Sequence, residues 1–119
     1  MLVVDDHEEF RASTRELLRA GGWDVVAEAA DSTGAVAAAR TLGPDLVLLD
    51  VGLAADDPGG DGIDVARTLA ALPDPPVVIL VSARSAASYG RRLADAPVRG
   101  FVPKAALSGQ ALEALLRRG

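Results

Sequence analysis

Four short apolar runs in this chain each end on a polar or charged side chain, and this pattern limits the fold more than any other feature. The runs and the residues that follow them are 1–4 with Asp5 and Asp6, 46–49 with Asp50, 77–81 with Ser82, and 100–103 with Lys104. The runs are nearly continuous and do not alternate between apolar and polar residues. Such runs are typical of parallel strands that are buried on both faces.

Helix-like segments separate the apolar runs. The sequence predicts one further strand at Asp24–Ala29 and places the strand of the last run at Arg99–Val102. It predicts helices at Glu8–Ala20, from Asp31 or Ser32 to Leu42, at Ile63–Leu72, weakly at 84–95, and after Ser108. Parallel strands need right-handed helical crossovers, so this alternation predicts one doubly wound α/β domain over residues 1–119. Its five-stranded parallel sheet should have helices on both faces, and its functional site should lie beyond the carboxyl ends of the strands.

Composition excludes several classes of function. The chain has 119 residues, no cysteine and a single histidine, His7, so it offers neither a thiolate site nor a multi-histidine metal site. The net charge of −5 argues against direct nucleic-acid binding by this domain. No apolar run approaches the ~20 residues that cross a bilayer, and no signal peptide is recognisable. We therefore expect a soluble cytoplasmic domain without a membrane segment.

Lys104 is the only lysine in a chain that has 12 lysine and arginine residues in total. A composition biased so strongly toward arginine should replace lysine wherever either cation serves. The one lysine therefore indicates a site that needs a compact ammonium and not a planar guanidinium.

The strand ends carry the segments Val3-Val4-Asp5-Asp6-His7, Leu48-Leu49-Asp50, Val81-Ser82-Ala83 and Gly100-Phe101-Val102-Pro103-Lys104. This ordered set resembles the receiver domain of bacterial two-component response regulators, and the likeness covers essentially the whole chain. The local sequence is most similar to receivers of the nitrate-response regulator class.

The resemblance implies that Asp50 accepts a phosphoryl group as an acyl phosphate. The donor would be a sensor histidine kinase. A divalent cation must then offset the repulsion between the carboxylate and the phosphoryl group, and Mg²⁺ prefers oxygen ligands. By resemblance, Asp6 and Asp50 bind Mg²⁺ directly, the Gly52 carbonyl adds an oxygen, and Asp5 acts largely through water.

The resemblance also assigns roles in switching. Lys104 would contact a phosphoryl oxygen, the Ser82 hydroxyl would bind another, and Phe101 would be the aromatic residue that repositions. The expected protein is a signalling switch that catalyses its own phosphorylation and dephosphorylation, and not a turnover enzyme. Its fourth helix, fifth strand and fifth helix would control a homodimer or an output domain, such as a DNA-binding domain outside this chain.

The loop after Asp50 and the bond after Lys104 depart from the family pattern. The loop after Asp50 is long, so that Asp61-Gly62 arrives late, and residues 54–60 are expected to be mobile and exposed. Asp56 and Asp57 in this loop are not expected to be inner-shell metal ligands. A degenerate receiver that acts as a phosphorylation-independent interaction module is therefore the alternative.

The peptide bond after Lys104 leads to alanine and not proline, so we expect it to be trans. We expect His7 to be a surface residue and not a ligand.

Overall fold

Five parallel strands form one sheet in the order β2-β1-β3-β4-β5 in a computed structural model, which describes residues 1–53 and 60–117. The strands are β1 (Leu2–Val4), β2 (Ala27–Ala29), β3 (Leu46–Asp50), β4 (Val77–Ser82) and β5 (Gly100–Pro103). The predicted doubly wound α/β fold is confirmed. The second strand is shorter than expected because it is an edge strand. Its only neighbour, β1, offers three residues to pair with, from Leu2 opposite Ala27 to Val4 opposite Ala29.

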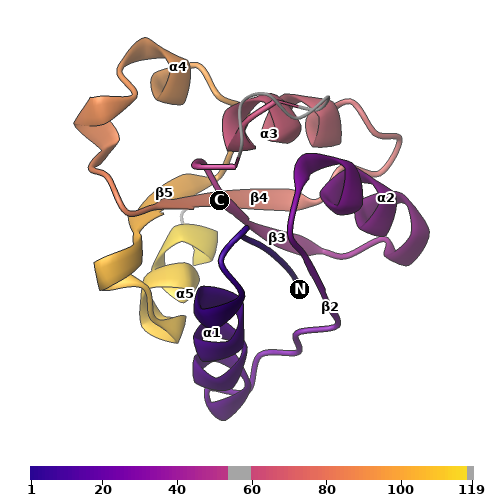
Figure 1. The fold of residues 1–119 in the computed structure, drawn as a ribbon, viewed down its shortest axis with the longest axis vertical. Coiled ribbons are helices and arrows are strands. Elements are labelled where there is room, and N and C mark those ends of the chain that lie inside the picture. The colour runs from indigo at the N-terminus through magenta and orange to yellow at the C-terminus, as the bar shows by residue number, and fades with distance from the viewer. Residues whose placement is uncertain (54–59, 118–119) are drawn as a thin grey trace.

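Helices cover both faces of the sheet, as Figure 1 shows. The helices are α1 (Glu8–Ala20), α2 (Ser32–Leu42), α3 (Gly62–Ala70), α4 (Arg91–Ala94) and α5 (Gly109–Arg117), with short 3-10 turns η1 (Ala86–Ser88) and η2 (Lys104–Ala106). Helices α1 and α5 lie on one side of the sheet, and α2, α3 and α4 lie on the other. Among the described helices, none is both long and apolar enough to cross a membrane.

Two apolar layers hold these helices to the strands. Val3, Leu48 and Ile79 pack with Leu18 of α1 and Leu112 of α5, and all five side chains are buried. The residues next to them in the strands point the other way, toward α2 and α3. Both faces of β1, β3 and β4 are buried. If one strand slipped by one residue along its neighbour, each of its side chains would move to the opposite face and lose its packing. The register that brings the strand ends together is therefore strongly specified.

Side-chain and glycine caps mark several helix ends. The Asp31 side chain accepts a hydrogen bond from the Gly34 N–H at 2.7 Å, and Gly43 ends α2 in the left-handed region with φ 56°. The Ser108 hydroxyl accepts from the Ala111 N–H at 3.0 Å at the start of α5. Helix α3 ends at Ala70, earlier than the predicted Leu72. These local bonds satisfy backbone groups that would otherwise lack partners at the helix ends.

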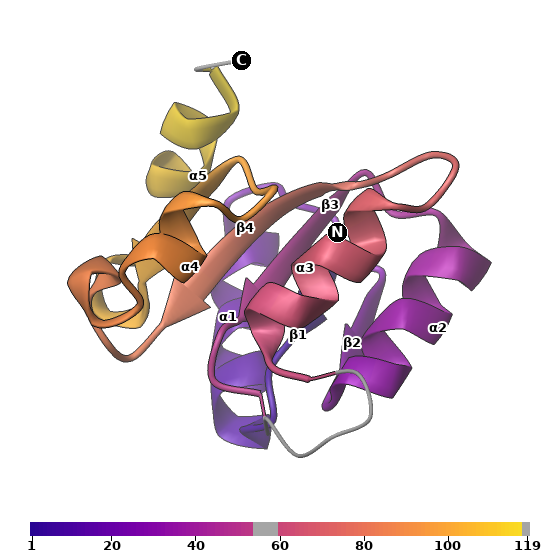
Figure 2. The ribbon, with the colours of Figure 1, turned by 90° about the horizontal axis from the view of Figure 1, so that it is seen from above.

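The segment 84–95 carries only the short elements η1 and α4, and neither contains a buried residue. This agrees with the weak helical pattern of its sequence. Figure 2 shows the segment at one side of the molecule, joined to β4 and β5.

Among the described residues there is no cis peptide bond, so the bond after Lys104 is trans as expected. The expectations for Asp56 and Asp57 fall on residues 54–59, which lie outside the described residues.

Candidate functional site

The carboxyl ends of β1, β3, β4 and β5 bring the predicted polar residues to one edge of the sheet. β1 lies between β2 and β3, so the strand order reverses beside it. Ligands of open α/β sheets bind at such a switch point. Asp5 directly follows β1, and Asp50 is the last residue of the adjacent strand β3. The two carboxylates therefore face each other across the switch point.

The turn after β1 fixes the position of Asp5. Its N–H donates to the Ala29 carbonyl at 3.1 Å, and its carbonyl accepts from the Arg11 guanidinium at 2.6 Å. Arg11 also lies 3.4 Å from Glu28 on the neighbouring strand. The backbone of Asp5 is thus held by both α1 and β2. Arg11 is a contributor that the sequence did not single out, although its place on the first turns of α1 is compatible with this role.

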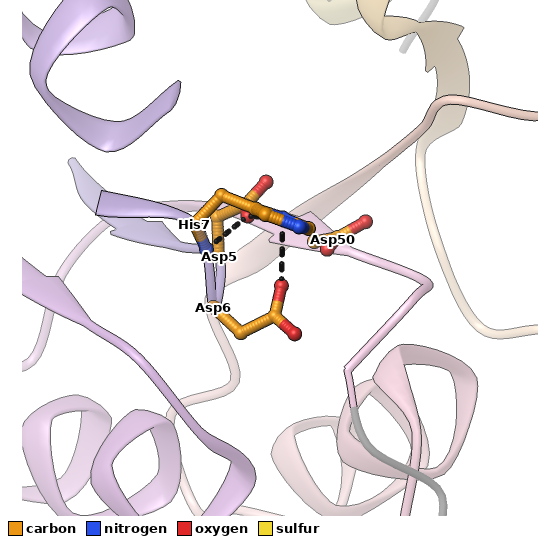
Figure 3. A group of neighbouring side chains, drawn as sticks. All are labelled: Asp5, Asp6, His7 and Asp50. Carbon is orange, nitrogen blue, oxygen red and sulfur yellow. Dashed lines mark hydrogen bonds and ion pairs between the residues drawn. The ribbon is translucent and has the colours of Figure 1, made fainter. Parts of the chain in front are cut away.

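Asp5, Asp6, His7 and Asp50 form an acidic cluster, drawn in Figure 3. Each offers a ligand atom, and these atoms lie within 4.8 Å of one another. Asp5 is fully buried and Asp50 is 3% exposed, whereas the Asp6 side chain is 41% exposed. The cluster is therefore deep on one side and open to solvent on the side of Asp6.

His7 lies closer to the carboxylates than the sequence suggested. Its side chain is 71% exposed, which agrees with a surface residue, but its Nδ1 is 3.1 Å from Asp5 Oδ1 and 2.9 Å from Asp6 Oδ1. Its backbone N–H also donates to Asp5 Oδ1 at 2.8 Å. The adjacency of the histidine to the acidic pair was the only sequence signal for this contact.

Lys104 reaches into the cluster from the end of β5. Its Nζ lies 2.6 Å from Asp5 Oδ2 and 3.7 Å from Asp50 Oδ2. Asp5 Oδ2 is buried and has no hydrogen bond of good geometry among the described residues, so the ion pair with Lys104 compensates its charge. The ammonium also lies 4.3 Å from the centre of the Phe10 ring, within cation–π range. One compact cation is thus held between two carboxylates and an aromatic face.

The charge of Asp50 is disfavoured by its surroundings. Burial is the largest cause and raises the pKa of the Asp50 carboxyl. The hydrogen bond from the Gly52 N–H, 3.0 Å long, lowers this pKa, Asp5 raises it, Lys104 lowers it, and Asp6 raises it. The net effect is a raised pKa of Asp50. A second cation in the cluster would relieve the repulsion of Asp50 by Asp5 and Asp6.

Gly62 is required by the approach of α3 to Asp50. A Cβ on Gly62 would lie 2.1 Å from the Asp50 carbonyl oxygen and 2.7 Å from Val51 Cα. The Gly62 N–H donates to the Val51 carbonyl at 3.1 Å. Just before it, Asp61 caps α3, and Arg92 of α4 binds the Asp61 carboxylate at 2.8 and 3.0 Å. The late Asp61-Gly62 pair therefore still packs against the Asp50 backbone.

Ser82 and Phe101 are linked through Tyr89, which the sequence reasoning did not single out. Ser82 is 2% exposed, and its hydroxyl is hydrogen-bonded to the Tyr89 hydroxyl. The Tyr89 and Phe101 rings are tilted by 59°, with centres 6.2 Å apart. Tyr89 is the only tyrosine in the chain, and it lies in the weakly helical segment 84–95. That isolation was the one signal that could have drawn attention to it.

The fold and the cluster define a two-component signalling domain, and comparison with known proteins agrees. The chain belongs to the response regulator receiver domain family, which its sequence matches over residues 1–116.

Curated relatives include the DNA-binding transcriptional activator EvgA of Escherichia coli strain K12, which is 38% identical over 103 residues. BvgA of Bordetella pertussis is 31% identical over 104 residues. Each match covers 87% of this chain and 48% of the relative, so the chain spans about half the length of these proteins.

Solved structures include the signal receiver domain of NarL from Mycobacterium tuberculosis, with a TM-score of 0.83 and 30% identity. That match covers 98% of this chain and 92% of the other. A LuxR-family two-component response regulator from Aurantimonas has a TM-score of 0.80 and 30% identity, covering 98% of this chain and 84% of the other. The predicted family is confirmed, and the likeness to a NarL receiver agrees with the nitrate-response class that the local sequence suggested.

Proposed function

We propose that this domain is a phosphorylation-controlled switch in which Asp50 accepts a phosphoryl group from a sensor histidine kinase. The observation that carries the proposal is the setting of Asp50. It ends β3 almost buried, with Asp5 and Asp6 on one side and the Lys104 ammonium 3.7 Å away. A carboxylate at a strand end with a compact cation beside it is suited to attack phosphorus.

In the proposed step, an Asp50 oxygen forms a bond to phosphorus as the bond from phosphorus to the kinase imidazole nitrogen breaks. The bonding pair leaves with the imidazole, and the product is an acyl phosphate. Lys104 balances negative charge on the transferred group, because it can pair with a phosphoryl oxygen while remaining near Asp5. The domain assists its own modification and hydrolysis but does not turn over a substrate.

The residues of the cluster fit Mg²⁺. They are rich in carboxylate oxygen, the ligand type that Mg²⁺ prefers, and their mutual repulsion favours a divalent cation. Asp6 and Asp50 would hold the ion directly with the Gly52 carbonyl, and Asp5, which is committed to Lys104, would act through water. When bound, Mg²⁺ would offset the charge between the carboxylate and an incoming phosphoryl group.

Phosphorylation would shift an existing equilibrium between inactive and active conformations. Ser82 would turn toward the phosphoryl group, and Phe101 would reposition. The surface of α4, β5 and α5 would then control a homodimer or an output domain outside this chain. The name of EvgA, a DNA-binding transcriptional activator of about twice this length, supports a DNA-binding output. The receiver itself, with a net charge of −5, is not expected to bind DNA. Placement in the cytoplasm stays a prediction.

Titration with beryllofluoride and Mg²⁺, followed by amide NMR, tests this proposal without knowledge of the kinase. Beryllofluoride stands in for a phosphoryl group on a carboxylate. We expect saturable shifts around Asp50, Ser82 and Lys104 that need Mg²⁺, and none of these shifts in Asp50→Asn. If the wild-type spectrum does not change, the domain is the degenerate receiver and the proposal is wrong.

A further inference from the structure

Among the described residues, both hydrogen-bond partners of the Ser82 hydroxyl, Arg84 and Tyr89, belong to the segment 84–95. The Ser82 hydroxyl accepts a hydrogen bond from the Arg84 N–H at 2.9 Å, and it is bonded to the Tyr89 hydroxyl. Ser82 is almost fully buried, so water has little access to replace either partner. A buried hydroxyl that loses a partner without a substitute costs free energy.

This arrangement conflicts with the role proposed for Ser82. A serine hydroxyl has one proton and two acceptor positions. To bind a phosphoryl oxygen on Asp50, Ser82 must direct its proton toward the end of β3. The bond to Tyr89 instead holds the oxygen toward the segment that follows β4. Turning Ser82 to the phosphoryl group therefore requires that the bond to Tyr89 breaks.

Tyr89 also reaches the second switch residue. Its ring packs beside the Phe101 ring at 6.2 Å, and both rings lie partly buried on the same apolar layer. Elsewhere in the segment, η1 and α4 contain no buried residue. Leu93 is partly buried on the same layer, and Arg92 pairs with Asp61 at the surface. Tyr89 is thus a single side chain that binds the hydroxyl of one switch residue and contacts the ring of the other.

We propose that Tyr89 is a positioning residue that holds Ser82 away from Asp50 in the unphosphorylated domain. Its ring couples the movement of Ser82 toward the phosphoryl group to the movement of Phe101. This inference rests on the proposed function and adds a residue that sets the equilibrium between the inactive and active conformations. When Ser82 turns to the phosphoryl group, the Tyr89 hydroxyl loses its partner. The ring is then free to move away from Phe101, and the segment before α4 moves with it.

The test compares beryllofluoride affinity, at saturating Mg²⁺, in the wild type, Tyr89→Phe, Ser82→Ala and the double variant. Tyr89→Phe keeps the ring that packs on Phe101 and deletes only the hydroxyl. It should bind beryllofluoride about two- to tenfold more tightly, which corresponds to the net worth of one hydrogen bond. In the Ser82→Ala background the same change should have no effect, because the hydroxyl that Tyr89 holds is gone.

A direct readout uses the single tyrosine of the chain. The ring ¹³Cζ resonance of Tyr89 reports the hydrogen bonding of its hydroxyl and needs no assignment among other tyrosines. We expect it to shift when the wild type binds beryllofluoride. In Ser82→Ala it should already lie near the shifted position before any ligand is added, so the test holds even if Ser82→Ala binds too weakly to measure.

Arg92→Gln is the matched control. It frees α4 from Asp61 and Asp64 without touching Ser82, so general loosening of this segment should change affinity by less than about twofold. If Arg92→Gln tightens beryllofluoride binding as much as Tyr89→Phe does, Tyr89 has only a structural role and the inference is wrong. The same holds if Tyr89→Phe raises the affinity equally in the wild-type and Ser82→Ala backgrounds. If the wild type binds beryllofluoride but Tyr89→Phe has the same affinity, the inference fails alone. If the wild type does not bind, the proposed function fails with it.

Discussion

Replacing Lys104 with methionine should destabilise the metal-free domain because it leaves a buried carboxylate without its cation. Methionine keeps most of the length of the side chain and its packing on Phe10. What it removes is the ammonium 2.6 Å from Asp5 Oδ2. Asp5 is fully buried, and that oxygen has no other polar partner among the described residues.

The expected loss follows from the burial of the pair. Breaking a fully buried ion pair costs about 3–5 kcal/mol. Lys104 is 17% exposed and the cluster opens to solvent at Asp6, so a loss of about 3 kcal/mol is reasonable. For a domain of this size, that loss lowers the melting temperature by roughly 10 °C.

The loss should depend on pH. Burial raises the pKa of Asp50, and removing Lys104 takes away one of the influences that lower it. A raised pKa in the folded state gives stability that is present in acid and is lost as the pH rises through that pKa. The difference between Lys104→Met and the wild type should therefore be smaller near pH ~4 than at neutral pH.

Thermal and urea unfolding of metal-free protein at both pH values measure this difference. Arg117→Met is the matched control, because Arg117 pairs with Glu113 at 3.8 Å with both side chains largely exposed, and its loss should be below ~1 kcal/mol. A Lys104→Met variant that is as stable as the wild type at neutral pH would refute the reasoning. So would a deficit that is equal at both pH values.

Three further predictions concern the same site. Asp6→Ala should weaken Mg²⁺ binding, measured by calorimetry, more than Asp5→Ala does, because Asp5 is committed to Lys104. Equal Mg²⁺ affinity of the wild type and Asp6→Ala would exclude this ligand set. Lys104→Arg should impair the beryllofluoride-induced NMR shifts despite its charge, and wild-type behaviour would remove the case for a compact ammonium. Gly62→Ala should cost about 1–3 kcal/mol in urea unfolding, because its Cβ would lie 2.1 Å from the Asp50 carbonyl; no loss would mean that α3 can move away.

The strands were predictable because their patterns are local and strong. Leu46–Asp50 and Val77–Ser82 have the predicted bounds, since each is an apolar run that ends on one polar residue. The edge strand was overestimated because its length depends on β1 and not on its own sequence. The convergence of Asp5, Asp50 and Lys104 followed from the rule that sites lie at carboxyl ends of parallel strands.

Other contacts could not be read from the sequence. The bond between Ser82 and Tyr89 depends on how a weakly structured segment folds back, and no periodicity specifies this. The pairing of Arg92 with Asp61 joins residues 31 positions apart and depends on where α4 lies. The position of His7 in the sequence predicts a surface residue and says nothing of the contact between its ring and two carboxylates. Side-chain pairings of this kind are set by tertiary packing and not by local pattern.

Phosphoryl transfer to Asp50 is the central claim, and labelling with acetyl phosphate and Mg²⁺ tests it most directly. Intact mass spectrometry should show the addition of one phosphoryl group, and chemical reduction of the acyl phosphate followed by peptide mapping should locate it at Asp50. Asp50→Asn should remain unlabelled, while Arg117→Met should label as the wild type does. Labelling that persists in Asp50→Asn, or that maps to another residue in the wild type, would contradict the account.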